Sequence, residues 1–264
     1  MSAEQPSVLV SRDAGVVTVT LNRPHKKNAI DGVTWGLLQQ TFDEVERSRD
    51  DRVLVITGAG GDFCSGADLT SLSDDDHGLR RMRRIGDVAL TLHRLTKPTI
   101  ARIDGVAAGA GMNLALGCDL IVASDRSRFA EIFAKRGLSV DFGGSWLLPR
   151  LIGLHRAKEL CLLADIISAQ QAADMGLVNR VVPVDQLDEV VGDWASRLAS
   201  GPPIALMSTK RLLNNAFEVT MEQALDDEAR TQTANFGTED TVEAFAAFAA
   251  KREPTFTGKP ITAR

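Results

Sequence analysis

Alternating apolar and polar positions predict short β-strands in the first two-thirds of the chain. The earliest two, at residues 8–10 and Val16–Leu21, are joined by Asp13, Ala14 and Gly15, a sequence typical of a hairpin turn. Short apolar runs bounded by glycine or polar residues predict further buried strands at 52–57, Thr99–Ile103, 120–123 and 178–182.

Apolar positions three and four residues apart predict helices between these strands and beyond them. Asp31 is a suitable N-cap residue for a helix that carries Trp35, Leu38, Phe42 and Val45 on one face. A second stripe runs from Leu79 to Leu95, and a Gly/Ala-rich helix follows from about Gly109. The C-terminal pattern predicts helices at 185–199, Pro203–Asn215, 220–236 and 238–250.

This order of elements predicts the organisation of the chain. Strands and helices recur up to about residue 200, whereas only helices are predicted after it. We therefore assign residues 1–200 to an α/β core and residues 201–264 to a helical C-terminal region. The sequence shows neither a Pro/Ser-rich linker between them nor an internal repeat.

Composition narrows the class of protein. The 264 residues are 44% hydrophobic and 25% charged, which is typical of a soluble globular protein, and the net charge of -5 argues against nucleic-acid binding. Cys64, Cys118 and Cys161 lie far apart in apolar surroundings, so we expect reduced, buried thiols rather than disulfides or a zinc site. The N-terminus has no signal-peptide pattern, and the apolar stretch 105–118 is shorter than the roughly 18 to 20 residues of a membrane span. We expect a cytoplasmic protein without a membrane segment.

Two glycine-rich turns are candidates for chemistry, at residues 58–69 and 104–113. Each follows a predicted strand and precedes a helical pattern, and each begins like a dinucleotide-binding fingerprint. Phe63 and Leu114 stand where that fingerprint requires its third glycine, and neither turn ends in the Gly-Lys-Ser/Thr of a phosphate-binding loop. Unpaired amides at two such turns can converge on one oxygen, although each turn taken alone is more typical of tight turns and close packing than of a functional site.

The two turns, in order with other motifs, resemble the enoyl-CoA hydratase/isomerase (crotonase) superfamily over nearly the whole chain. The motifs are Leu21-Asn22-Arg23-Pro24 with Asn28-Ala29-Ile30, residues 63–69, residues 104–113 with Gly117-Cys118-Asp119, residues 137–150, residues 168–172 with Gly176-Leu177-Val178, and residues 251–256. The resemblance implies a spiral of β-β-α units, a helical C-terminus that forms trimers or dimers of trimers, and an acyl-CoA thioester substrate. It implies no cofactor apart from the coenzyme A of the substrate, and no metal.

The resemblance also implies which residues surround the substrate. The backbone N–H groups that stabilise the enolate oxygen fall on Ala67 and Ala110. Ala29, Ala67, Asp68 and Leu69 correspond to the path of the CoA adenine and pantetheine. Lys26 or Lys27 corresponds to a contact with the CoA phosphates, and a solvated loop is an equally good interpretation of these lysines.

Two departures from the family pattern bear on the reaction. Family hydratases hold a water molecule between two glutamates, and those positions are Asn113 and Phe133 in this sequence. Neither side chain can transfer a proton, so the sequence argues against water addition by that route. Glu131 lies two residues before the second position, and we interpret it as a surface or structural carboxylate.

Asp141 corresponds to the acid of family isomerases that act on dienoyl-CoA and on ring-type phenylacetyl-CoA intermediates. A single carboxylate there can remove a proton from a carbon conjugated to the thioester, and apolar neighbours can raise its pKa from about 3.9. Asp141 is also well placed to cap a helix that begins near Gly143. We favour an isomerase, with an enoyl-CoA hydratase as the first alternative and a catalytically weak acyl-CoA- or RNA-binding relative as the second.

Two charged clusters are interpreted as solvated surface. Asp74, Asp75, Asp76 and His77 resemble a metal-binding run, but adjacent residues rarely converge on one ion. A basic helix face is formed by Arg80, Arg81, Arg83 and Arg84. Such a face is usually solvated, and less often it contacts CoA phosphates or a neighbouring subunit. No Gly-x-Ser-x-Gly motif is present, which argues against serine-hydrolase chemistry.

Overall fold

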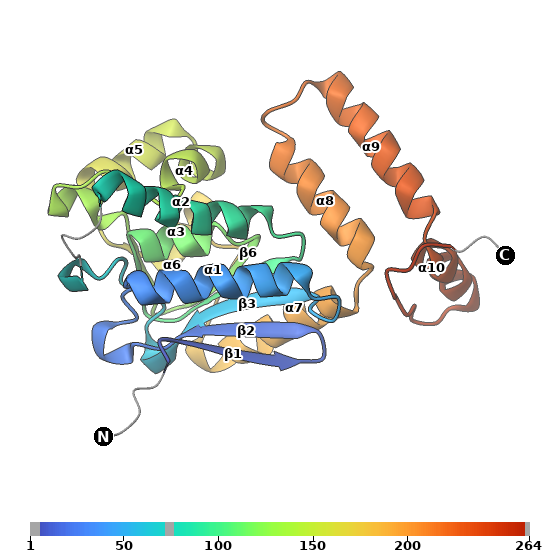
Figure 1. Ribbon diagram of the computed structural model, residues 1–264, viewed down its shortest axis with the longest axis horizontal. Coiled ribbons are helices and arrows are strands. Elements are labelled where there is room, and N and C mark those ends of the chain that lie inside the picture. The colour runs from blue at the N-terminus through green and yellow to red at the C-terminus, as the bar shows by residue number, and fades with distance from the viewer. Residues whose placement is uncertain (1–5, 72–76, 262–264) are drawn as a thin grey trace.

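A six-stranded sheet lies at the centre of the computed structural model, which describes residues 6–71 and 77–261 (Figure 1). Its strand order is β1-β2-β3-β4-β6-β9, with β1 antiparallel to β2 and all other neighbouring pairs parallel. The strands are β1 (Val8–Asp13), β2 (Val16–Leu21), β3 (Val53–Gly58), β4 (Thr99–Ile103), β6 (Leu120–Ser124) and β9 (Arg180–Val182).

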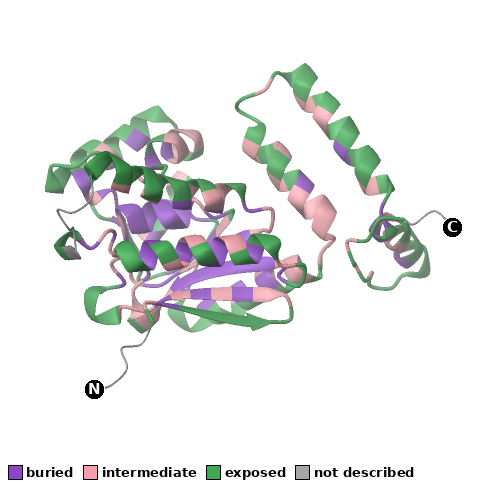
Figure 2. Ribbon diagram, in the orientation of Figure 1, coloured by how far each residue is buried: buried purple, intermediate pink, exposed green. Residues whose placement is uncertain are grey.

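Strand β3 shows why these apolar runs form buried strands. Successive side chains of a strand point to opposite faces, and Leu54 and Ile56 join the large hydrophobic cluster that includes α1 (Gly32–Arg47) and α2 (Gly78–Arg94). Val53 and Val55 join a second cluster on the other face, under α7 (Leu187–Ser200). Figure 2 shows β3 and the neighbouring α3 (Ala110–Leu116) as buried elements. Both faces of the sheet are therefore covered, as expected for parallel strands.

A smaller three-stranded sheet extends the core beside α3. It contains β5 (Val106–Ala108), β7 (Arg128–Ala130) and β8 (Ile167–Ser168), in the order β5-β7-β8. The short helix Ile132–Arg136, then α4 (Gly144–Ile152), α5 (Leu154–Leu163) and α6 (Ala169–Met175) complete this part of the core.

The C-terminal helices extend away from the core. They are α8 (Pro203–Asn215), α9 (Met221–Phe236) and α10 (Glu239–Ala250), and Figure 1 shows α8 and α9 as an antiparallel pair beside the core, with α10 beyond them. Large apolar side chains are exposed on these helices and their connections: Leu213, Phe217, Met221, Leu225, Phe236, Val242, Phe245 and Phe248. Each of these residues is more than half exposed in a single chain.

Most long elements confirm the predictions. The Asp31 carboxylate accepts a hydrogen bond from the Thr34 N–H at 2.8 Å at the start of α1, and α8 spans the residues expected. Strands β5, β7 and β8 and helices α5 and α6 were not predicted from the sequence. All three cysteines are free thiols, but Cys161 is only partly buried.

Candidate functional site

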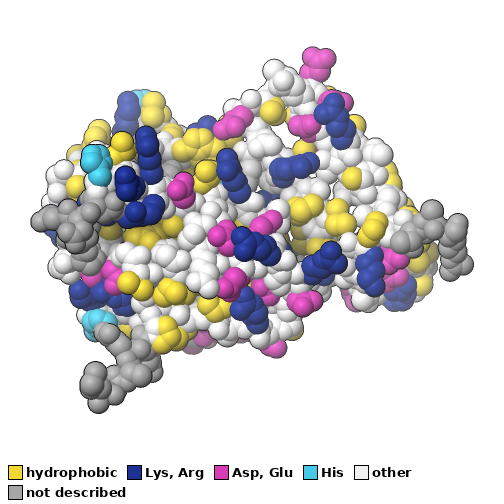
Figure 3. Space-filling view, in the orientation of Figure 1, with side chains coloured by type: hydrophobic (Ala, Val, Ile, Leu, Met, Phe, Trp, Pro, Cys, Tyr) yellow, Lys and Arg dark blue, Asp and Glu magenta, His cyan; other side chains and the backbone are white. Residues whose placement is uncertain are grey.

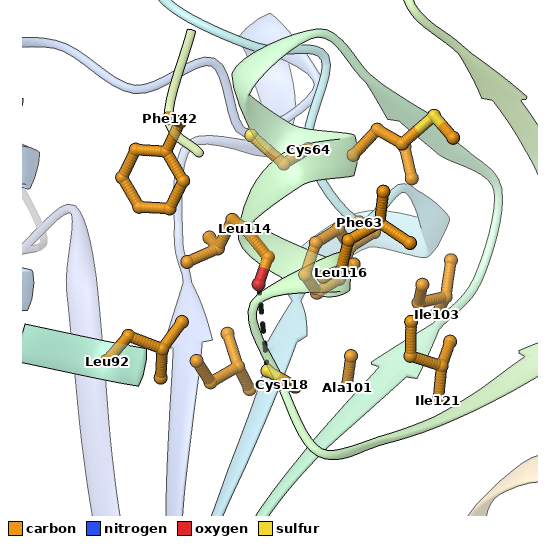
Figure 4. Packing of buried hydrophobic residues seen from close by; sticks show 14 of the residues in the cluster. Phe63, Cys64, Leu92, Ala101, Ile103, Leu114, Leu116, Cys118, Ile121 and Phe142 are labelled. Carbon is orange, nitrogen blue, oxygen red and sulfur yellow. Dashed lines mark hydrogen bonds between the residues drawn. The ribbon is translucent and has the colours of Figure 1, made fainter. Parts of the chain in front are cut away.

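The two glycine-rich turns lie against each other, as expected. The Cys64 N–H donates to the Val106 carbonyl and the Ala108 N–H donates to the Cys64 carbonyl, both at 2.9 Å. Figure 4 shows Cys64 beside α3, with Phe63 and Leu114 in the core beneath it. A Cβ built on Gly111 would lie 2.7 Å from the Cys64 Sγ, so glycine is required where α3 passes the first turn.

This contact brings the N–H groups of Ala67 and Ala110 close together. A Cβ built on Gly66 would lie 3.7 Å from the Ala110 nitrogen, and the Gly66 carbonyl is held by the Ile30 N–H at 2.8 Å. Ala110 is the first residue of α3, where N–H groups have no intrahelical acceptor. Across residues 6–71 and 77–261, neither the Ala67 nor the Ala110 N–H has a hydrogen-bond acceptor. The site thus contains two neighbouring free donors.

Asp141 does not cap α4, so the capping interpretation is wrong. The N-cap residue of that helix is Gly143, and within the described residues no side chain hydrogen bonds to this helix start. The Asp141 backbone carbonyl, not its carboxylate, accepts from the Gly144 N–H at 3.0 Å. The buried Oδ1 of Asp141 has no hydrogen-bond partner among the residues that the structure describes, and burial raises the pKa of this carboxyl to about 6.

Asn113 connects Asp141 to Glu131. Its side-chain Nδ2 donates to the Asp141 carbonyl at 3.0 Å and to Glu131 Oε2 at 3.4 Å. A Cβ built on Gly144 would lie 2.5 Å from the Asn113 amide, so the glycine makes room for this contact. Phe133 is buried, and a Cβ built on Gly109 would lie 3.6 Å from its Cζ. The positions that hold glutamates in family hydratases are thus filled by an amide and a ring.

Glu131 is not a surface carboxylate, and that part of its interpretation is wrong. Its exposed fraction is 0%, and burial raises its pKa to about 8, against a smaller lowering by the Asn113 hydrogen bond. The signal that could have identified it is a lone carboxylate in the apolar run Phe129-Ala130-Glu131-Ile132-Phe133.

The residues expected along the CoA path form an ion-paired turn. Arg23 and Lys26 each place a nitrogen 2.9 Å from Oδ2 of the buried Asp68. The Thr70 hydroxyl, Lys26 and Arg23 all hydrogen bond to this carboxyl and hold its pKa well below the usual range, against the opposing effect of burial. The Lys27 side chain is 61% exposed, with its Nζ 3.9 Å from Asp62.

The outer part of this region is more open. Ala29 is partly shielded by the loop, since the Arg23 guanidinium hydrogen bonds to its carbonyl at 2.6 Å. Leu69 is exposed. These positions are accessible to a ligand that approaches along the outer side of the first turn.

A cavity of about 550 Å³ opens between α1 and α2, next to Ala67, which carries one of the two free donors. Ala67 and Asp68 line one side, and Ile30, Trp35, Ile85 and Val88 supply apolar walls. The Trp35 ring stacks on Phe142 with a centroid distance of 5.0 Å, and Phe142 directly follows Asp141. One wall of the cavity, Trp35, therefore contacts the segment that carries Asp141. Trp35 and Phe142 were not identified as site residues from the sequence.

Basic side chains border this cavity. Figure 3 shows Lys and Arg side chains gathered over the first half of α2, where Arg81 and Arg84 line the opening together with Asp87. Both arginines have interaction partners.

The acidic run that was compared with a metal site, Asp74 to Asp76, lies outside the described residues. Within the described residues, no group of three or more His, Cys, Asp or Glu side chains could hold a metal ion. None of the described helices is long and apolar enough to cross a membrane.

Comparisons with known proteins agree with this geometry. The profile of the family described as enoyl-CoA hydratase/isomerase matches residues 11–259. The chain is 38% identical over 258 residues to the 1,2-epoxyphenylacetyl-CoA isomerase of Escherichia coli K12, covering 96% of this chain and 98% of that protein. It is 36% identical over 255 residues to the 2,3-dehydroadipyl-CoA hydratase of the same organism, covering 96% and 99%. The crystal structure of the enoyl-CoA hydratase of Bacillus anthracis matches with a TM-score of 0.92 at 32% identity, covering 96% and 100%.

Proposed function

The chain belongs to the enoyl-CoA hydratase/isomerase family and has the crotonase-type fold, and we propose that within this family it is an acyl-CoA isomerase with Asp141 as its base. The observation that carries the proposal is the state of Asp141. Its carboxylate caps no helix in the described structure, its buried Oδ1 has no partner there, and its pKa is raised to about 6. A carboxylate with that pKa is ionised at pH 7 and is a stronger base than an exposed aspartate.

The proposed reaction uses the two free donors and this one base. The thioester oxygen accepts hydrogen bonds from the Ala67 and Ala110 N–H groups. Asp141 removes a proton from a carbon conjugated to the thioester, and the electron pair of the broken C–H bond moves into the acyl group as charge accumulates on the thioester oxygen. The protonated Asp141 then returns a proton to a different carbon, so the double bond moves without any change of oxidation state. No cofactor beyond the coenzyme A of the substrate is needed.

The substrate is assigned to the cavity between α1 and α2. Its apolar walls suit an acyl group, and Trp35, in one of these walls, stacks on Phe142, the residue that follows Asp141. The CoA moiety follows Ala29, Asp68 and Leu69, with Lys27 exposed to contact a phosphate. The relative named 1,2-epoxyphenylacetyl-CoA isomerase supports a ring-type acyl group as one substrate to test.

The hydratase remains the second candidate because relatives of similar identity carry that name. The arrangement of Asn113 and Phe133 argues against it, since neither side chain can activate a water molecule. Another carboxyl group, Glu131, lies in the same region but has no exposed surface.

The apolar C-terminal surface supports the proposal that the protein assembles as a trimer or as a dimer of trimers. Phe217, Phe245 and Phe248 are exposed by 72%, 64% and 86% in the single chain. Exposed apolar surfaces of this kind are typical of subunit interfaces.

The direct test of the proposed activity is product analysis with two substrates. Purified protein is incubated separately with a 2-enoyl-CoA and a 3-enoyl-CoA, and products are separated by chromatography and identified by mass. An isomerase interconverts the two without a change of mass, whereas a hydratase produces a species heavier by one water. Hydration as the dominant reaction of the 2-enoyl-CoA would overturn the proposal.

A further inference from the structure

Glu131 is a buried residue to which the proposed reaction gives no role. It follows β7 directly and has an exposed fraction of 0%. Its Oε2 accepts one long hydrogen bond, 3.4 Å from Asn113 Nδ2, and its Oε1 has no partner within the described residues. The described structure pairs it with no cation. A buried carboxylate with so little compensation is strongly disfavoured, so the carboxyl is neutral at pH 7.

The group that Glu131 contacts also holds the Asp141 segment. Asn113 Nδ2 donates to the Asp141 carbonyl at 3.0 Å. The next two residues, Phe142 and Gly143, have φ values of 49° and 82°, in the left-handed region. A non-glycine residue in this conformation needs support from its surroundings, and the Asn113 amide supplies one such contact. The orientation of that amide therefore affects where the Asp141 carboxylate points.

The orientation of Asn113 depends in turn on Glu131. Since the Asn113 Oδ1 is buried without a partner in the described structure, the amide is fixed by its Nδ2 contacts alone. A neutral acid at position 131 accepts from Nδ2 without attracting it away from the Asp141 carbonyl. An ionised Glu131 would compete more strongly for the same donor, because hydrogen bonds to charged acceptors are stronger.

We propose that Glu131 is a positioning residue for the isomerase reaction, which as a neutral acid fixes the Asn113 amide and thereby the Asp141 base. This inference rests on the proposed function. The titratable groups coupled to Glu131 are Asp141, on the segment before α4, and Cys161, on α5, whose pKa is raised by burial and by Glu131. Ionisation of Glu131 at alkaline pH places a second negative charge near Asp141 and disturbs Asn113, so the isomerase rate declines there.

The test compares Glu131→Gln, Glu131→Met and the control Glu159→Gln, which changes an exposed glutamate on α5. Gln keeps a carbonyl acceptor for Asn113 and cannot ionise, whereas Met keeps the length of the side chain and loses the acceptor. We expect Glu131→Gln and the control to retain the isomerase kcat at pH 7 within about threefold, and Glu131→Met to lose on the order of tenfold to a hundredfold in kcat with little change in KM. The alkaline decline of kcat should disappear in both Glu131 variants, since neither side chain ionises, and should persist in Glu159→Gln.

A second readout does not depend on the isomerase reaction. The Asp141 side-chain carboxyl is titrated by carbon-13 NMR in wild type and in the two Glu131 variants. The proposal expects its midpoint near pH 6 in wild type and in Glu131→Gln, and a displaced midpoint in Glu131→Met. Identical titrations in all three proteins, or equal loss of kcat in the Gln and Met variants, would overturn the positioning role. Absence of isomerase activity in wild type, with the displaced midpoint present, would instead overturn the proposed function alone.

Discussion

The Glu131→Gln variant should change how stability depends on pH. In the unfolded chain this carboxyl ionises at its ordinary pKa of 4.5, whereas in the folded protein its pKa is about 8. Between these two pH values the folded protein keeps a proton that the unfolded chain has released. Linkage then requires that wild type loses stability as the pH rises from about 4.5 to about 8, and that the full contribution is present only below that interval.

The size of this loss follows from the same interval. Each pH unit costs about 1.36 kcal/mol, so the free energy of unfolding falls by on the order of 3 to 5 kcal/mol across it. The amide of the Glu131→Gln variant does not titrate, so the variant should not show this component. The raised pKa of Asp141 adds a decline between its ordinary value of 3.8 and about 6, but both proteins share it.

The assay is equilibrium unfolding in urea, followed by circular dichroism, for wild type and Glu131→Gln at pH 4.5 and pH 8. Chain concentrations must be equal, because assembly would make stability depend on concentration. The two proteins should differ little at pH 4.5, and the variant should be the more stable by several kcal/mol at pH 8. A constant difference at both pH values would refute the neutral, buried state of Glu131.

Three further outcomes follow from the geometry. Wild type should hydrate crotonyl-CoA far more slowly than family hydratases, as measured by loss of enoyl-thioester absorbance, and ordinary hydratase turnover would contradict this prediction. The double variant Asn113→Glu, Phe133→Glu should hydrate crotonyl-CoA faster than wild type if the space between the two side chains admits water. Gly111→Ala should lower the free energy of unfolding by about 1 to 3 kcal/mol, because the added Cβ would overlap Cys64. The control Gly192→Ala, whose Cβ has no neighbouring atom within 4 Å, should not lower it, and equal stability of the two variants would contradict the tight contact at Gly111. Light scattering at micromolar concentration should give the mass of a trimer or hexamer, and a monomer would refute the assembly.

The long helices and strands could be predicted because burial of one face makes apolar residues recur at regular intervals over many positions. Helix α8 begins at Pro203, where a residue without an N–H fits the first turn, and ends at Asn215, as expected. Strands β5, β7 and β8 are only two or three residues long, which is too short for a period to be visible. They form because distant segments pair with one another.

The two glycine-rich turns were predictable for a related reason, since glycine marks close approach of backbone segments. The competing interpretations of Asp141 were not separable from the sequence. Gly143 takes the N-cap position only because Phe142 and Gly143 adopt left-handed backbone conformations, which no local pattern indicated. The burial of Glu131 likewise depends on packing with segments far away in the sequence, including Asn113. Its position in an apolar run was the only local sign.

The central claim is that Asp141 is the base of an isomerase. Its most direct test is the rate of double-bond migration in a 3-enoyl-CoA, measured for wild type, for Asp141→Asn and for the control Asp185→Asn at an exposed position. The wild-type rate should rise with pH through about 6, as Asp141 ionises. Asp141→Asn should lose on the order of a hundred- to ten-thousand-fold in rate at pH 7 with acyl-CoA affinity nearly unchanged. Its Tm should be no lower than that of wild type, since the amide avoids the cost of a buried charge, while Asp185→Asn should match wild type in all three. Retention of most of the rate by Asp141→Asn would contradict the account and place the proton carrier elsewhere.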